Sequence, residues 1–167
     1  MSAVLKHCRK LQDMTPQHLD AVLAIELTCY EFPWSRGNFI DSMAAGHPAQ
    51  LLSDAGGELL GYFVALDGPD EMHLLNLTVA PAAQGHGHAK YLLDALVAMS
   101  RSRGARQLWL EVRQSNERAR AIYRHCGFAD VGLRRRYYPA PHGRREDAVV
   151  MCLPIELPDP EASHALD

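Results

Sequence analysis

Residues 84–93, QGHGHAKYLL, constrain this chain of 167 residues more than any other segment. They follow a nearly apolar run at 73–81, which is typical of a central strand of a sheet. From Ala89 onward the apolar residues recur with the spacing of a buried helix face. A glycine turn between strand and helix presents free backbone N–H groups at the positive end of the helix dipole. We therefore expect this turn to bind phosphate.

Two common nucleotide motifs do not fit this turn. A P-loop needs GxxxxGK followed by Ser or Thr, which the chain lacks, and the dinucleotide fingerprint GxGxxG would need a glycine where Lys90 stands. An open pyrophosphate cradle remains, with Lys90 available for a phosphate. His86 and His88 alternate on the turn, but no third metal ligand lies nearby in the sequence. We expect no metal here, and histidine side chains that face solvent.

Composition and charge exclude several classes of protein. A net charge of −3 gives no reason to expect non-specific nucleic-acid binding. No apolar run reaches the roughly 18 to 20 residues of a membrane span, and the first residues lack the apolar core of a signal peptide. Four scattered cysteines without a CxxC pair predict buried free thiols in a reducing cytoplasm, and no zinc site. We expect a cytoplasmic protein that is monomeric or weakly dimeric.

The remaining patterns predict a mixed sheet with helices packed on it. Thr15 and Pro16 begin a helix that extends to about Tyr30, and Ser35 caps a second, short helix. Strands are predicted at 49–54, 58–67, 73–81, 107–112, 128–138 and 146–155, and helices from about Ala89 to Gly104 and from Ser115 or Asn116 to Gly127. The fold class is therefore α+β. We expect one domain over residues 1–155 and a flexible tail over 156–167.

The glycine turn and three other segments resemble one known family. QGHGHA matches the (Q/R)xxGx(G/A) signature of the GCN5-related N-acetyltransferases, the GNAT superfamily. LWLEVRQSNERARAIYRHCGF, RRRYYP with GRREDAVVM, and FPWS are similar to segments of its RimI-type branch, which acetylates the N-terminal alanine of a ribosomal protein. The resemblance implies the GNAT fold, with a central, mostly antiparallel sheet of six to seven strands and helices on both faces. It also implies acetyl-CoA as co-substrate, without a metal.

Acetyl transfer requires an amine that loses a proton and a thiolate that gains one. Glu111 interrupts the apolar strand LWLEV, and from the pattern alone it either lies at a cleft or points outward beside Gln107 and Trp109. Tyr123 shares an apolar helix stripe, so it is either a core residue or a proton donor. The resemblance implies that Glu111 is the general base and Tyr123 the general acid.

The resemblance also implies the residues that hold the cofactor. Asn116 would hydrogen-bond the pantetheine arm, although a plain helix cap explains it equally. The backbone of one strand would pair with that arm, and the turn would hold the pyrophosphate. These cofactor-binding positions are Leu77, Thr78, Val79, Gln84, Gly85, His86, Gly87, His88, Ala89, Lys90 and Asn116.

Three aromatic residues are candidates for substrate binding. Tyr137 and Tyr138 match tyrosines on the loop that receives a peptide N-terminus in related enzymes, although packing within a strand is the alternative. Trp34 is expected in the core or the cleft wall, on a loop that borders the acceptor site in this fold. The adjacent Arg134–Arg136 run is read first as a solvated strand end, with contact to cofactor phosphate or ribosomal RNA as the alternative.

The expected reaction is direct transfer of an acetyl group from acetyl-CoA, and the resemblance implies that the acceptor is the N-terminal alanine of small-subunit ribosomal protein number eighteen. An α-amino group has a pKa of about 8 against about 10.4 for lysine, a gap of about 3.3 kcal/mol, so a single carboxylate base suits it better. A small-molecule amine or polyamine acetyltransferase is the alternative, and a CoA-sensing module without catalysis is less favoured. No cysteine lies in a nucleophile context, so we expect no acetyl-enzyme.

Overall fold

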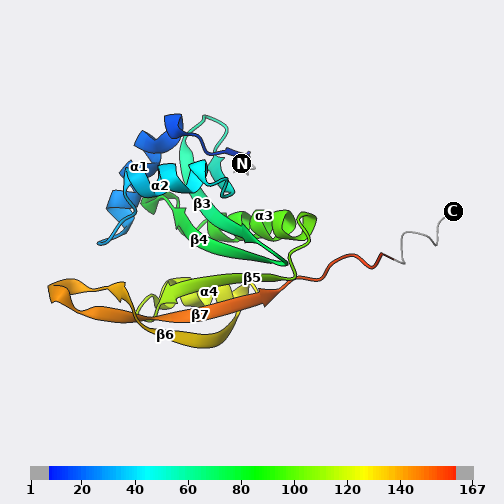
Figure 1. Cartoon of the computed structure of the whole chain (residues 1–167). Coiled ribbons are helices and arrows are strands. Elements are labelled where there is room, and N and C mark those ends of the chain that lie inside the picture. The colour runs from blue at the N-terminus through cyan, green and yellow to red at the C-terminus, as the bar shows by residue number, and fades with distance from the viewer. Residues whose placement is uncertain (1–7, 161–167) are drawn as a thin grey trace, which may run out of the picture.

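The computed structural model describes residues 8–160 as a single sheet with helices on both faces (Figure 1). The strands are β1 (Lys10–Asp13), β2 (Ala49–Ser53), β3 (Leu59–Gly68), β4 (Glu71–Val79), β5 (Gln107–Arg113), β6 (Ala129–Pro139) and β7 (Arg145–Pro154). The helices are α1 (Leu19–Cys29), α2 (Arg36–Ala44), α3 (His88–Ser102) and α4 (Glu117–His125). The strand order is β1-β2-β3-β4-β5-β7-β6, and within residues 8–160 only β4 and β5 pair in parallel. The predicted α+β, mostly antiparallel sheet is confirmed.

The local signals place most helix ends where the sequence predicts them. The Ser35 hydroxyl accepts a hydrogen bond from the Asn38 N–H and begins α2. Gly127, at a φ of 100°, follows the last turn of α4. A short 3-10 turn, Pro16–His18, precedes α1 where one continuous helix was predicted. The edge strand β1 was not predicted, because its four residues are too few to give an alternating pattern.

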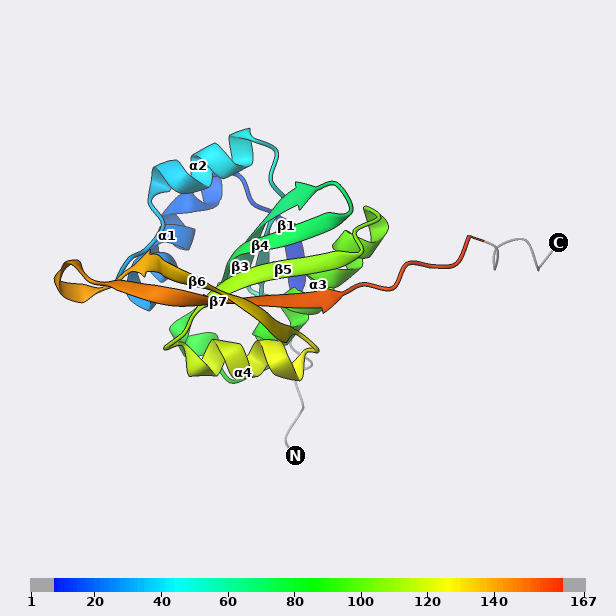
Figure 2. The same cartoon turned by 60° about the horizontal axis from the view of Figure 1, so that its bottom comes forward.

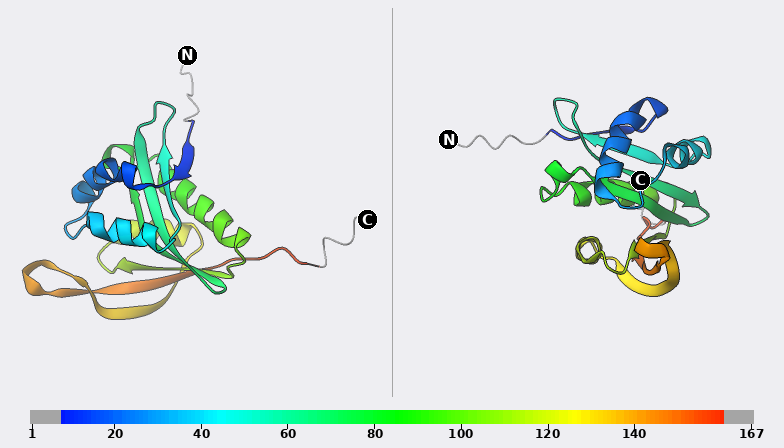
Figure 3. Two further views of the ribbon diagram at one scale, coloured as in Figure 1. Left: turned by 45° about the horizontal axis from the view of Figure 1, so that its top comes forward. Right: turned by 90° about the vertical axis from the view of Figure 1, so that its left-hand side faces the viewer.

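Two apolar cores lie on opposite faces of the sheet. α1 and α2 contribute Leu19, Val22 and Phe39 to one core, which also contains Tyr62 of β3. α3 contributes Leu92, Leu93 and Leu96 to the other core, against which α4 also packs. Figures 2 and 3 show α1 and α2 on one side of the strands and α3 on the other. The amphipathic stripe predicted for α3 is thus the part of that helix that the sheet buries.

An extra residue in β4 divides the sheet. In the pairing with β3, Val64 lies opposite Asn76 and Ala65 opposite Leu74, so Leu75 is a β-bulge. Because the bulge reverses the alternation, Met72 and Leu74 face α3, whereas Asn76 contacts Glu26 of α1. The parallel pairing with β5 also ends here, at Leu74 and Leu110. β4 and β5 diverge beyond this point.

The predicted tail lies mostly outside the described part of the chain. Residues 155–160 contain neither helix nor strand, and residues 161–167, like residues 1–7, are not described. Across residues 8–160 no helix is both long enough and apolar enough to span a membrane.

Gly61 provides a test of how closely β3 and β4 approach. A Cβ at this position would lie 2.6 Å from the carbonyl oxygen of Thr78 and 3.3 Å from the Cα of Val79. We predict that Gly61→Ala lowers the free energy of unfolding by about 2 kcal/mol, since backbone must move to admit the methyl group. Urea unfolding measures this. Gly132→Ala, where a Cβ meets nothing within 4 Å, is the control, and equal stability of the two variants would contradict the prediction.

Candidate active site

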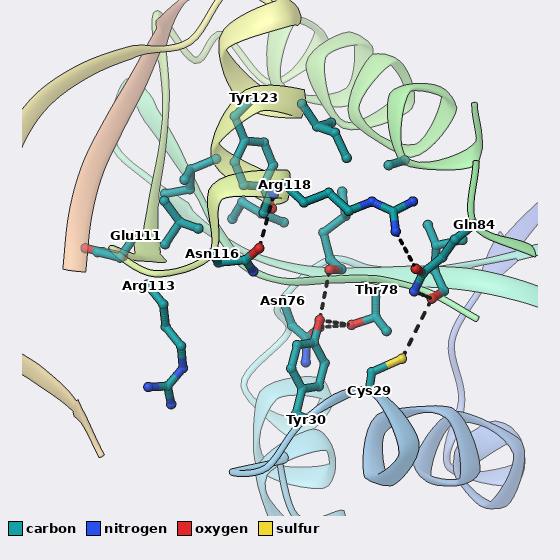
Figure 4. A pocket seen from close by; sticks show the side chains of 18 of the residues that line it. Cys29, Tyr30, Asn76, Thr78, Gln84, Glu111, Arg113, Asn116, Arg118 and Tyr123 are labelled. Atoms are coloured by element: carbon teal, nitrogen blue, oxygen red, sulfur yellow. Dashed lines mark hydrogen bonds between the residues drawn. The ribbon is translucent and has the colours of Figure 1, made fainter. Parts of the chain in front are cut away.

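The divergence of β4 and β5 opens a cleft of about 1070 Å³ (Figure 4). Its walls come from the second half of β4, the end of β5, the turn before α3, α4, and the end of α1 with the loop that follows it. Most residues predicted for the site lie on these walls. His86 and Tyr137 are not among the lining residues.

The glycine turn has the backbone shape that a pyrophosphate cradle needs. Gly85 and Gly87 have φ values of 82° and 79°, in the left-handed region that glycine adopts without strain. Gly87 is the N-cap of α3 and has no side chain with which to cap it. The first N–H groups of a helix have no partner within the helix, so the start of α3 can bind an anion in the cleft.

The two histidines of the turn differ from each other. His86 is exposed, as expected, and its carbonyl oxygen accepts a hydrogen bond from Arg9. The expectation for His88 was wrong, because this residue is only 5% exposed and its Nδ1 accepts a 3.1 Å hydrogen bond from Arg9 Nε. Arg9 therefore holds the turn through contacts with both histidines. No local sequence pattern could reveal a contact between residues so far apart in the chain.

Arg118 joins α4 to the turn. Its guanidinium donates a 3.0 Å hydrogen bond to the side-chain oxygen of Gln84, while the amide nitrogen of Gln84 donates to the Val79 carbonyl. Gln84 thus connects β4 to α4 at the end of the cleft (Figure 4). Lys90, expected to be available for phosphate, forms an exposed ion pair with Asp94 at 2.7 Å. Arg118, which lines the cleft beside the glycine turn, was not predicted from the sequence.

Glu111 lies in the cleft wall with a side chain only 7% exposed. Leu108, Leu110 and Val112 of the same strand belong to the core under α3, so Glu111 lies on the face that α1 and α2 cover. One carboxylate oxygen bonds His73 Nε2 and the other lies 3.2 Å from Arg134 Nε. The outward-facing alternative is therefore wrong for Glu111. Arg134 is not only part of a solvated strand end, because it forms an ion pair with Glu111.

The pairing of β6 with β7 places Arg134 on the face of Glu111. Gly132 of β6 and Glu111 of β5 both pair with Val150 of β7, and Arg134 lies two residues after Gly132. The register with β7 is interrupted between Arg134 and Tyr138, and Arg136 has a φ of 53° within this bulge. The Arg136 N–H donates to Asp147, which fixes the bulge. An arginine run alone carries no information on which guanidinium turns inward.

α4 brings Tyr123 and Asn116 to the cleft from the opposite face (Figure 4). Tyr123 packs on Phe128 with ring centroids 5.7 Å apart, and burial raises the pKa of its hydroxyl well above 10, so it is a phenol at neutral pH. Asn116 is the N-cap of α4, accepting a 3.1 Å hydrogen bond from the Ala119 N–H. The cap interpretation of Asn116 is confirmed.

Arg113 connects two walls at the cleft entrance. Its guanidinium lies 4.6 Å from the ring of Tyr138 on β6 and 5.5 Å from the ring of Phe32 in the α1–α2 loop. The Tyr138 hydroxyl donates to the Glu111 carbonyl at 3.0 Å. Trp34 lines the cleft and packs on Phe39 at 5.1 Å, as expected for a cleft wall. Tyr137 packs edge-on against Tyr138.

A buried polar group next to the cleft was missed entirely. Glu26 of α1 is only 1% exposed. Its carboxylate accepts hydrogen bonds from the Trp34 N–H, the Asn76 amide and the Tyr62 hydroxyl. Thr78 and Tyr30 continue this network into the cleft wall. Glu26 occupies an apolar-looking helix face, so only its burial in the folded chain distinguishes it from a surface carboxylate.

The four cysteines are free but not uniformly buried. Cys152 is buried, Cys29 and Cys126 are partly buried and line the cleft, and Cys8 is exposed, so the expectation of buried thiols was wrong for Cys8. Burial raises the pKa of the thiols of Cys29 and Cys126, which keeps them protonated and poorly nucleophilic at neutral pH. Residues 8–160 hold no group of three or more His, Cys, Asp or Glu side chains arranged for a metal ion.

Comparisons with known proteins agree with this geometry. The family model described as the acetyltransferase (GNAT) family matches residues 19–128. The [ribosomal protein bS18]-alanine N-acetyltransferase of Haemophilus ducreyi is 36% identical over 143 residues, covering 86% of this chain and 98% of that protein.

Solved structures share the fold. The crystal structure of the ribosomal-protein-S18-alanine N-acetyltransferase from Escherichia coli superposes with a TM-score of 0.82 at 34% identity, covering 91% of this chain and 97% of that one. A phosphinothricin acetyltransferase from Sinorhizobium meliloti, solved in complex with AcCoA, superposes with a TM-score of 0.72 at 23% identity, covering 88% of each chain. The second similarity concerns the fold alone.

The buried tyrosines predict how stability depends on pH. Burial raises the pKa of Tyr30 to about 12, and it raises the pKa values of Tyr62, Tyr123 and Tyr138 as well. Above about pH 10 the unfolded chain releases tyrosine protons that the folded chain retains, so stability is full below pH 10 and falls as pH rises toward 12. We predict that Tyr30→Phe removes about 2 kcal/mol of this loss. Urea unfolding between pH 8 and 12 measures it, and an unchanged slope in the variant would contradict it.

Proposed function

The chain belongs to the GNAT family of acetyltransferases, and from this membership we propose that it transfers an acetyl group from acetyl-CoA to the N-terminal alanine of ribosomal protein bS18. The Haemophilus ducreyi and Escherichia coli relatives, which are 36% and 34% identical to this chain, carry that activity in their names. The observation that carries the proposal is a cleft with an anion cradle on one face of the splayed strands and the Glu111 carboxylate on the other. Such a cleft admits donor and acceptor from opposite sides.

The residues present fit acetyl-CoA, which supplies the activated acetyl group as a thioester. The uncapped N–H groups of α3 would bind the pyrophosphate together with Arg118, which the hydrogen bond to Gln84 holds at the cradle. The backbone of β4 beyond Leu74 does not pair with β5 and would hydrogen-bond the pantetheine arm. The proposed cofactor-binding positions are Leu77, Thr78, Val79, Gln84, Gly85, His86, Gly87, His88, Ala89, Lys90 and Asn116, with the exposed side chains of His86 and Lys90 contributing least.

Glu111 and Tyr123 would move the two protons of the reaction. The carboxylate of Glu111 takes a proton from the acceptor amine as the C–N bond forms. Tyr123 gives its phenolic proton to the sulfur as the C–S bond breaks, so the products are an N-acetylated chain and a free thiol. His73 and Arg134 hold the carboxylate in one orientation. Direct transfer accords with the protonated state of the cleft cysteines.

The cleft entrance would receive a peptide. Arg113 holds Tyr138 and the α1–α2 loop on either side of the entrance, with Trp34 further along the wall. Tyr137, half-exposed beside Tyr138, would contact the chain that follows the N-terminal residue. We further propose one domain over residues 1–155, action in the cytoplasm as a monomer or weak dimer, and no metal or direct nucleic-acid partner.

Substitution of the two proton-transfer residues tests the roles and the substrate together. The purified protein is incubated with acetyl-CoA and a peptide carrying the bS18 N-terminus, and mass spectrometry locates the acetyl group. We predict acetylation of the alanine amine, with kcat/KM lowered at least about 100-fold in Glu111→Gln and in Tyr123→Phe, because each loses a proton-transfer group without a change of shape. Glu58→Gln, in the β2–β3 turn, and Tyr91→Phe, outside the cleft, are the matched controls.

The acceptor panel separates the proposed substrate from its alternative. The same peptide with a blocked N-terminus, a peptide with an internal lysine and a polyamine complete the panel. Acetylation of the polyamine without acetylation of the alanine amine would contradict the substrate and retain the enzyme class. Full activity of Glu111→Gln would contradict the role of the general base.

A further inference from the structure

A hydrogen-bond chain leads from the buried Glu26 carboxylate to Tyr30 in the cleft wall. The Asn76 amide nitrogen donates to both oxygens of Glu26, at 3.3 and 3.2 Å. The Thr78 hydroxyl donates to the Asn76 side-chain oxygen at 2.8 Å, and the Tyr30 hydroxyl lies 2.7 Å from the Thr78 hydroxyl. Figure 4 shows Tyr30 pointing from the end of α1 toward β4, where these partners lie.

The donor and the acceptor of each hydrogen bond in this chain are fixed by the carboxylate at its end. A carboxylate only accepts, so the Asn76 nitrogen faces Glu26 and its oxygen faces Thr78. Thr78 has one hydroxyl hydrogen, which it donates to Asn76, so Tyr30 is the donor in the contact with Thr78. The other acceptor within reach of Tyr30 is the Leu77 carbonyl at 3.3 Å. Either way the phenolic hydrogen points into β4, and the Tyr30 oxygen can only accept a hydrogen bond from a ligand in the cleft.

This oxygen lies on the acceptor side of the splayed strands. The bulge at Leu75 turns Asn76 and Thr78 toward α1, the face on which Glu111 also lies. The anion cradle and Tyr123 lie on the opposite face, with α3 and α4. A ligand that meets the Tyr30 oxygen is therefore the acceptor rather than the donor. Burial raises the pKa of Tyr30 to about 12, so the phenol keeps its proton, and its direction, at neutral pH.

We propose that Tyr30 is an acceptor-positioning residue, whose phenolic oxygen accepts a hydrogen bond from an N–H of the primary amine to be acetylated. This inference rests on the proposed function, because it assigns a contact to that acceptor. An amine held by one N–H has its lone pair restricted in direction, as attack on a carbonyl requires. Glu26, Asn76 and Thr78 do not touch the amine and act by orienting the Tyr30 hydroxyl.

A binding cycle isolates this contact from chemistry. Calorimetry measures the Kd of the bS18 N-terminal peptide for the complex of protein and CoA, in which no acetyl group can transfer. A second peptide carries propionyl in place of alanyl and so lacks only the amine. Tyr30→Phe is expected to weaken binding of the amine peptide about tenfold, as loss of a hydrogen bond to a charged group does. Binding of the propionyl peptide should change less than about twofold, and so should the Kd of CoA.

Thr78→Val supplies a second variant that keeps shape and burial while removing the hydroxyl. Because Thr78 acts through Tyr30, it should weaken the amine peptide by itself and add nothing in the Tyr30→Phe background. Tyr91→Phe, outside the cleft, is the control and should bind both peptides as the wild type does. Equal weakening of the two peptides by Tyr30→Phe, or none, would overturn the proposal.

The result is separable from a failure of the proposed function. If the wild type acetylates a different amine of the panel, the proposed substrate fails, and the same cycle is run with that amine and its analogue lacking the amino group. Loss of discrimination in Tyr30→Phe then still supports the positioning role. Retained discrimination would contradict that role whichever acceptor is used.

Discussion

The bulge at Leu75 is the feature on which the site depends. It ends the parallel pairing of β4 with β5 at Leu74 and Leu110, so a continuous sheet opens in its middle while both halves keep their own strand partners. The same extra residue turns Asn76 and Thr78 toward α1. One backbone irregularity therefore creates the cleft and supplies polar groups to one of its walls.

Hydrogen-bond donors surround each of the two buried carboxylates at the cleft. Glu26 accepts hydrogen bonds from three residues, and Glu111 is held between His73 and Arg134. An ionised carboxylate removed from water is costly unless such partners replace the lost hydration. The partners come from α2's preceding loop, β3, β4 and β6, so the carboxylates also join elements that are distant in the sequence. The walls of the cleft are thereby held at a definite separation.

The glycine turn before α3, the proposed anion cradle, relies on local geometry, in contrast to the carboxylates. Two left-handed glycines and an uncapped helix start are properties of a few consecutive residues. For that reason the turn before α3 was predicted correctly from the sequence, together with the helix stripe, the capping residues Ser35 and Asn116, and six of the seven strands. Resemblance in four short segments then predicted the family, which the comparisons confirm.

The sequence by itself determined most of the elements, the glycine turn before α3 and the family, because periodicity, caps and glycine turns are encoded by neighbouring residues. Only the tertiary structure decided that His88 is buried against Arg9, that Arg134 rather than its neighbours meets Glu111, and that Glu26, Asn76, Thr78 and Tyr30 form one network. These contacts join residues up to 79 positions apart. The bulge in β4 turns Asn76 and Thr78 toward α1, strand pairing brings Arg134 to Glu111, and the energy of a buried polar group is defined only once its partners are in place.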